Sequence, residues 1–194
     1  MKTLLLDSSN VDLSVGVSID NKLVYQTSFE AWQRQSEFMI PEIEKALSET
    51  GIELKDFDEV VCGKGPGSFT GVRIALTIGK VIAVMTGAKL KLVSSLRMFG
   101  SRDMKFISVM NARSARSYIG VYDKDQIVIE DTIFTNEETI KFINEHPDFL
   151  LIGDSKYLGL DGIKPKAIEG MLSFKDLVEE EKDVMSSKPV YLKD

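Results

Sequence analysis

The chain has 194 residues, of which 43% are hydrophobic and 28% are charged, and its formal net charge is −6. This length and composition are typical of a soluble globular protein with one domain or two small lobes. The negative charge argues against a stand-alone nucleic-acid-binding protein, because such a protein normally presents a basic face.

The sequence also indicates where the protein works. Cys62 is the only cysteine, so no intrachain disulfide can form, which fits a reducing cytoplasm. The apolar run at residues 4–6 is too short for a signal peptide. No stretch approaches the roughly 20 apolar residues of a membrane span. We therefore expect a cytoplasmic protein without membrane contact.

The chain begins with three predicted strands. Residues 2–7 are a short apolar run that ends in an acid, and residues 12–19 place alternate apolar side chains on one face. Residues 22–29 follow directly after Asp20-Asn21, which is a good turn pair. We therefore predict three consecutive strands joined by tight turns.

Two helices with a strand between them follow. Apolar residues recur at helical spacing over residues 36–50, and Pro41 inside this pattern predicts that the helix starts near it or bends there. Residues 58–64 predict a buried strand that leads into a glycine-rich loop and a long helix over residues 70–86. This order of elements is typical of the ribonuclease-H-like lobe, an α/β unit of the two-lobed actin and Hsp70-like ATPases.

We predict a first lobe over residues 1–101 and a smaller, variable second lobe over residues 102–194. The elements of the second lobe are three strands, a helix, a strand and an acidic helix, at residues 105–111, 117–123, 126–134, 136–146, 148–154 and 173–184. Asn136 is the expected cap of the first of these helices. The only histidine, His146, lies at the end of that helix and is interpreted as a helix-terminal cation or a surface residue.

The helix over residues 70–86 carries two apolar stripes, although a helix that covers one sheet needs only one. The first stripe is mostly small and suits close packing on a sheet: Val72, Ala75, Leu76, Gly79 and Ala83. The second stripe is larger: Ile74, Ile78, Val81 and Met85. It packs on the helix over residues 36–50, or it forms a partner surface, and both can hold. We favour an interface, formed with Met39, Ile43 and Leu47 of the first helix.

The glycine-rich loop allows two interpretations. A phosphate site needs backbone N–H groups and a helix N-terminus directed at the anion, and the loop also offers hydroxyls and an arginine. However, its spacing matches neither the P-loop nor the dinucleotide fingerprint. We therefore favour a tight turn in which Ser68 or Thr70 caps the helix. The loop and helix start comprise Gly65, Pro66, Gly67, Ser68, Phe69, Thr70, Gly71 and Arg73.

A nucleotide site is at best half complete. In ATPases of this lobe type the phosphates contact the first hairpin, and a metal is held near the acid that ends the first strand, here Asp7. A glycine-rich hairpin and a glycine pair are also needed in the second lobe, where Gly120 and Gly153 stand in no such motif. We expect Asp7, Ser8 and Ser9 to form a vestigial nucleotide site, and we predict no metal site.

Five stretches resemble the TsaB (YeaZ) family, the catalytically silent relatives of TsaD. In order, they are LLLDSS, RQSEFMIPEIEKAL, GKGPGSFTGVRIAL, LVSSL and MNARSARSYIGVY, within residues 1–122. The resemblance implies a role in forming threonylcarbamoyladenosine (t6A) at adenosine 37 of tRNA, where TsaD transfers the threonylcarbamoyl group. It also implies a heterodimer with a TsaD-like protein, contact with a TsaE-like ATPase, and a homodimer in isolation through the two first-lobe helices.

The resemblance further implies a scaffold subunit without catalytic activity. TsaD-like enzymes bind their metal through a His-x-x-x-His pair after the second helix, where this chain has Ser95 and Phe99. Neither side chain is a substitute ligand. No cofactor would be required by this chain, ATP or ADP would lie at the complex interface, and tRNA would be reached only through the complex.

Two alternatives remain open on the residues alone. A small-molecule kinase or ATPase of the same superfamily would use Asp7 and the serines after it. A peptidase would need a nucleophile and a base, and the only cysteine and the only histidine are predicted to lie on different lobes. We rank the scaffold first and the peptidase last.

Overall fold

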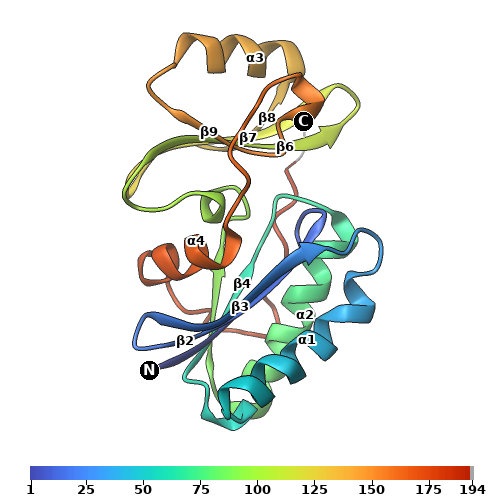
Figure 1. Cartoon of the computed structure of the whole chain (residues 1–194), viewed down its shortest axis with the longest axis vertical. Coiled ribbons are helices and arrows are strands. Elements are labelled where there is room, and N and C mark those ends of the chain that lie inside the picture. Colours follow the sequence, from blue (N-terminus) through green and yellow to red (C-terminus); the bar gives the residue numbers. More distant parts are fainter. Residues whose placement is uncertain (193–194) are drawn as a thin grey trace.

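The computed structural model describes residues 1–192 and contains two β-sheets, which lie one above the other in Figure 1. The first sheet has the strand order β3-β2-β1-β4-β5. Its strands are β1 (Lys2–Asp7), β2 (Asp12–Ile19), β3 (Lys22–Glu30), β4 (Glu59–Gly63) and β5 (Lys89–Val93). β2 is antiparallel to β1 and β3, whereas β1, β4 and β5 are parallel. The predicted strands are confirmed, and β5 is an additional strand that the sequence pattern did not predict.

Two helices cover one face of the first sheet. α1 spans Gln35–Thr50 and α2 spans Phe69–Thr86, each beginning one residue before the helical pattern in the sequence. Both helices end at a glycine in the left-handed region, Gly51 and Gly87, which bonds back to the last turn. Pro41 lies inside α1, so the predicted helix start near this proline is wrong.

The first apolar stripe of α2 packs on this sheet, as predicted. All five of its residues are buried: Val72, Ala75, Leu76, Gly79 and Ala83. A Cβ atom at Gly79 would lie 2.3 Å from the sulfur of Cys62 on β4, so the helix lies closer to the strand than a side chain would allow. α2 is also the one helix of the described region that is long and apolar enough to cross a membrane, but this stripe makes it a core helix.

The second sheet repeats the order of the first four strands as β8-β7-β6-β9. Its strands are β6 (Lys105–Arg113), β7 (Arg116–Asp123), β8 (Gln126–Thr135) and β9 (Leu150–Gly153). α3 (Asn136–Glu145) covers its outer face (Figure 1). The two sheets, the second one smaller, confirm the predicted two-lobed actin/Hsp70-like α/β fold.

The cap of α3 corrects one prediction. Thr135 is the N-cap instead of Asn136, because its hydroxyl accepts the N–H of Glu138 (3.1 Å). The Glu138 carboxylate in turn accepts the N–H of Thr135 (2.8 Å), which completes a capping box. The side chain of Asn136 accepts a hydrogen bond from Ser117 Oγ (3.0 Å).

The C-terminal part of the predicted second lobe returns to the first sheet. α4 (Ala167–Phe174) packs on β1 and β2, on the face opposite α1 and α2. Its Ile168 side chain would lie 2.4 Å from a Cβ atom at Gly16 of β2. The second lobe therefore does not include all of residues 102–194, because the apolar face of α4 covers the open face of the first sheet.

The predicted acidic helix over residues 173–184 is wrong. α4 ends before the acidic run, and only a 3₁₀ turn follows it. Residues 179–191, which we call the C-terminal strap, then run along β5 and α2, with bends and a turn over residues 182–186. The 3₁₀ turns of the chain lie at Leu54–Asp56, Arg97–Phe99, Lys156–Leu158 and Lys175–Leu177.

Candidate functional site

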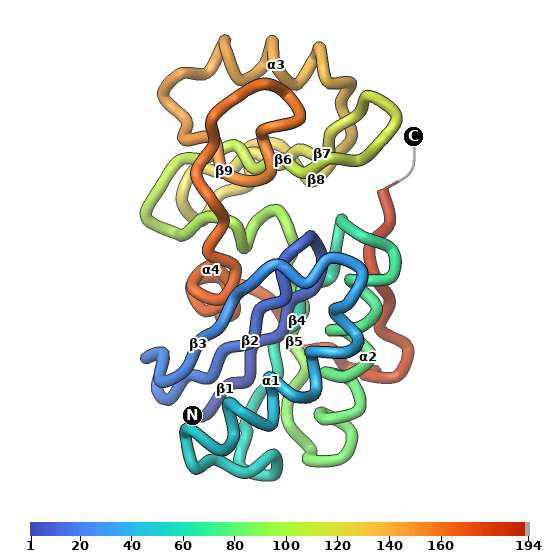
Figure 2. The backbone as a smooth tube through the Cα atoms, turned by 45° about the vertical axis from the view of Figure 1, so that its right-hand side comes forward, coloured from blue at the N-terminus to red at the C-terminus, as the bar shows by residue number. Residues whose placement is uncertain are grey.

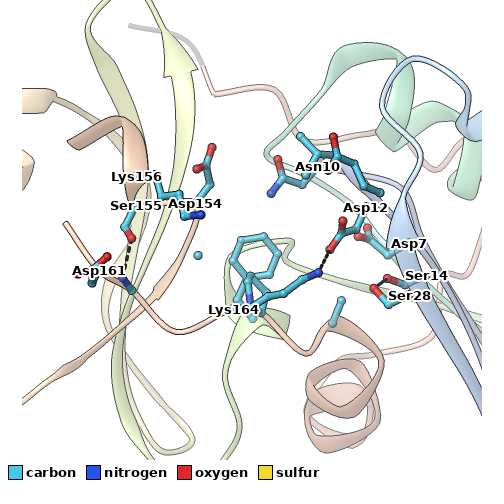
Figure 3. Close-up of a pocket in the computed structure, with 17 residues that line it drawn as sticks. Asp7, Asn10, Asp12, Ser14, Ser28, Asp154, Ser155, Lys156, Asp161 and Lys164 are labelled. Carbon is cyan, nitrogen blue, oxygen red and sulfur yellow. Dashed lines mark hydrogen bonds and ion pairs between the residues drawn. The ribbon is translucent and has the colours of Figure 1, made fainter. Parts of the chain in front are cut away.

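A cavity of about 370 Å³ opens between the two lobes (Figure 3). The turn after β1 and the end of β3 form one wall, and the segment from β9 to α4 forms the other. Five carboxylates line the cavity: Asp7, Asp12, Glu30, Asp154 and Asp161. Lys156 and Lys164 also line it, and Phe99 contributes to its apolar part. The volume is sufficient for a small molecule.

Asp7 is the most buried carboxylate of the cavity, with 3% of its surface exposed. Burial raises its pKa to about 6, although hydrogen bonds from Ser9 act in the opposite direction. These bonds come from the Ser9 N–H (3.1 Å) and hydroxyl (3.2 Å). The structure therefore brings Asp7 and Ser9 together, with the carboxylate held by the chain itself.

The charges of the cavity do not suit a polyphosphate. Lys164 is paired with Asp12 at 3.3 Å (Figure 3). Burial raises the pKa of Asp154, while Lys156 and Arg113 lower it. Carboxylates outnumber lysines on the walls, so a bound triphosphate would face repulsion.

Asp7→Asn should stabilise the fold at pH 7.5. The folded pKa of Asp7 is raised above its ordinary 3.8, so stability falls as pH rises from about 4 through about 6 and the carboxyl ionises. The asparagine variant avoids this penalty, which is about 3 kcal/mol. Thermal melts of both proteins should differ at pH 7.5 and converge near pH 4. A difference that does not change with pH would contradict this account.

The glycine-rich loop lies against Ser8 and Ser9. The Ser8 hydroxyl donates to the carbonyl of Gly71 (2.7 Å) and accepts the N–H of Ala75 (3.2 Å). The Ser68 N–H donates to the carbonyl of Ser9 (2.7 Å). The predicted cap is confirmed, because Ser68 Oγ accepts the N–H of Gly71 (3.2 Å). These polar groups of the loop are thus used inside the chain.

Gly67→Val should destabilise the protein severely. A Cβ atom at Gly67 would lie 2.2 Å from the carbonyl oxygen of Ser9, which is backbone and cannot move away cheaply. We expect a fall in free energy of unfolding of about 3 kcal/mol or loss of soluble protein. Thr70→Val is the control, because Thr70 is exposed in the first turn of α2, three residues after Gly67. A Gly67 variant that melts normally and loses only nucleotide affinity would indicate a phosphate site instead.

Ser95 and Phe99, the positions where the resemblance would place the two histidines, have structural contacts. Ser95 is buried, its hydroxyl accepts the N–H of Gly65 (3.0 Å), and its N–H donates to the Gly65 carbonyl (2.9 Å). Phe99 is buried between the lobes. His146 caps α3, where its ring stacks on Phe142 with centroids 4.0 Å apart. Within residues 1–192, no three His, Cys, Asp or Glu side chains form a group that could hold a metal.

The predicted interface needs two corrections. Met39 and Ile43 are buried in the first-lobe core, so they cannot face a partner. Leu47, Ile74 and Ile78 are half-buried at the junction of α1 and α2. Packing on α1, the first of the two interpretations of the second stripe, therefore accounts for its half-buried residues, Ile74 and Ile78.

The outer part of the stripe remains exposed. Val81 is 50% exposed and Met85 is 77% exposed, and the unpredicted Val84 is 56% exposed. Ile40 of α1 is also exposed, and its spacing of seven from Leu47 could have identified it. We call the exposed line of Val81, Val84 and Met85 the α2 ridge.

Lys164 and Asp154 of the cavity carried no sequence signal, because their positions depend on how the lobes meet.

Comparisons with known proteins agree on one family. Residues 29–144, more than half of the chain, match the family model described as TsaD, tRNA N6-adenosine threonylcarbamoyltransferase. The chain is 27% identical over 137 residues to the tRNA threonylcarbamoyladenosine biosynthesis protein TsaB of Bacillus subtilis, covering 69% of this chain and 60% of that protein. For the Escherichia coli TsaB the identity is 29% over 148 residues, covering 72% and 61%.

Two solved structures resemble the whole chain. YeaZ from Pseudomonas aeruginosa superposes with a TM-score of 0.81 at 21% identity, over 98% of this chain and 99% of that one. The ethanolamine utilization protein EutJ from Carboxydothermus hydrogenoformans superposes with a TM-score of 0.50 at 12% identity, over 89% and 88%. These likenesses establish the fold. In sequence, the chain spans about 60% of the length of the Bacillus and Escherichia relatives.

Proposed function

This chain belongs to the TsaB (YeaZ) family of TsaD-type proteins, and we propose on that premise that it is a non-catalytic subunit for t6A modification of tRNA. It would pair with a TsaD-like transferase and keep it active for threonylcarbamoyl transfer to adenosine 37. A TsaE-like ATPase would join this pair, and the chain would form a homodimer when the transferase is absent.

The observation that carries this proposal is the exposed α2 ridge. Three large apolar side chains stand at least half exposed on a helix whose other face is buried. Contiguous exposed apolar side chains are typical of protein interfaces. The absence of catalysis is supported by Ser95, which stands where the resemblance places a metal-binding histidine of the transferases. Its hydroxyl and N–H are both bonded to Gly65 of the glycine-rich loop.

The proposal for the cofactor follows from the cavity. Its acidic walls disfavour a polyphosphate bound to this chain alone. ATP or ADP would therefore lie at the junction with the transferase, which would supply the missing cationic groups. tRNA would be bound through the complex, in agreement with the net charge of −6.

Reconstitution tests the proposal. A TsaD-like transferase, a TsaE-like ATPase, the adenylate-forming synthase and unmodified tRNA are combined with and without this chain. We expect t6A only when the chain is present. Equal product without the chain would reject the proposal.

A second candidate is a small-molecule kinase or ATPase. It is favoured by the position of Asp7 at the end of β1, on the wall of a cavity between two lobes. Steady turnover of ATP by the purified chain, abolished in Asp7→Asn, would favour this candidate over the scaffold.

A further inference from the structure

The C-terminal strap covers the free edge of the first sheet. The Glu181 N–H donates to the carbonyl of Leu90 on β5 (2.8 Å). Glu180 pairs with Lys91 as an antiparallel bridge. An uncovered sheet edge would expose unpaired backbone groups, so these contacts fix the strap to the lobe.

The strap also binds the two cations of α2. Lys80 Nζ donates to the carbonyls of Met185 (2.6 Å) and Ser187 (3.0 Å). Arg73 Nε donates to the hydroxyl of Tyr191 (2.7 Å). Both cations of α2 therefore have hydrogen-bond partners on the strap.

The α2 ridge lies between the strap and α1. At about 100° per residue, Arg73 and Lys80 lie on one side of Val81, and Ile78 lies on the other side, toward α1. Figure 2 shows the strap, in red, along the side of α2 away from α1. The strap and α1 therefore flank the ridge on its two sides.

The strap adds apolar side chains at both ends of this surface. Tyr191 stacks on Phe69 at the start of α2, with ring centroids 5.2 Å apart, and Phe69 is itself 57% exposed. Met185 is 68% exposed beside Lys80. Methionine and aromatic side chains are enriched in protein interfaces. Lys80 is bonded to the strap, and the Arg73 guanidinium stacks on Phe69 at the start of α2, 3.8 Å from the ring centroid. The α2 ridge itself therefore carries no cation of α2, and it suits an apolar protein face.

We propose that the C-terminal strap is part of the docking surface for the TsaD-like transferase, and this inference rests on the proposed function. The partner seats an apolar helix face on the α2 ridge, and it contacts Met185 beside Lys80 and Tyr191 at the start of α2. The strap holds Lys80 at the side of the ridge, so the ridge binds without burying an unpaired charge of α2.

The test measures the affinity of this chain for its TsaD-like transferase by titration calorimetry. Met185→Asp and Tyr191→Asp place a carboxylate on the strap, and each should weaken binding at least 10-fold. Ile127→Asp is the matched control, because Ile127 is 42% exposed on β8 of the second lobe. Melting temperatures of all variants verify that they fold. Tyr191→Phe, which keeps the ring but loses the hydrogen bond to Arg73, should weaken binding less than Tyr191→Asp.

The outcomes separate this inference from the proposed function. If the wild-type chain does not bind the transferase, the proposed function fails and the inference fails with it. If the wild type binds and both strap variants bind equally well, the inference is rejected and the proposed function stands. Equal weakening by Ile127→Asp would also reject the inference, because a carboxylate on the second lobe would then have the same effect as one on the strap. Weakening by the strap variants alone supports it.

Discussion

Val81→Asp should leave the chain folded but weaken its association with the TsaD-like transferase about 100-fold. Val81 is 50% exposed on α2, so the free chain can solvate a carboxylate there. In the complex that carboxylate would be buried against an apolar face without a partner, which costs about 3 kcal/mol. The formation of t6A in the reconstituted reaction should fall in parallel.

The control for this variant is Val24→Asp. Val24 lies on β3 and is 49% exposed, so the same substitution is made at nearly the same exposure on another surface. Its affinity and product yield should equal those of the wild type. Unchanged association of Val81→Asp in light scattering and calorimetry would remove the α2 ridge from the interface. Ile78→Asp is a less clean variant, because Ile78 packs against the core and the substitution would also lower stability.

Lys175→Met should lower the free energy of unfolding by about 3 kcal/mol. Lys175 is fully buried after α4, and its Nζ lies 2.6 Å from a carboxylate oxygen of Glu59, itself only 2% exposed. Thr3 also donates to Glu59 (2.8 Å), and Lys91 lies 3.2 Å from it. Removal of Lys175 leaves Glu59 with a single cation in a buried site. Denaturant titration at pH 7 measures the loss.

The double variant tests the cause of that loss. Glu59→Gln combined with Lys175→Met removes both charges, so it should be more stable than Lys175→Met alone. Lys55→Met is the control, because its ion pair with Glu53 is exposed and should contribute nothing measurable. A double variant that is less stable than Lys175→Met would show that packing, and not charge, is the cause.

The pH dependence of the pair has a defined sign. Burial raises the pKa of Glu59, but its hydrogen bonds with Lys175 and Thr3 lower the pKa by more than burial raises it. The pKa of Glu59 is therefore below the ordinary 4.5. Burial lowers the pKa of Lys175, and its bonds with Glu59 and Asp176 raise it above 10.5. The stabilisation is therefore complete between about pH 4.5 and pH 10.5, and it is lost below and above that window.

Local patterns identified most of the first lobe. The alternation over residues 12–19 and the helical period over residues 70–86 each depend on neighbours within a few residues, and both elements were found. The Ser68 cap and the helix-ending glycines are likewise fixed by short-range backbone chemistry. The glycine-rich string also identified the family, because its motif is highly specific.

The packing partners of these elements could not be found in this way. The stripe of Met39 and Ile43 has the same helical spacing whether it faces a core or a partner, and only the position of the sheet decides that both are buried. The acidic run after Phe174 has a high helix propensity, yet residues of this run bond to the edge of β5 instead.

The sequence by itself therefore determined the family and most elements up to α3, but it missed β5 and misplaced the last helix. The tertiary structure decided that α4 and the C-terminal strap return to the first lobe, and that Asp7, Asp154 and Lys164 line one cavity. The physical reason is the range of the interactions. Periodicity and capping act over one or two turns of chain, whereas the cavity and the α2 ridge depend on contacts between residues more than a hundred positions apart.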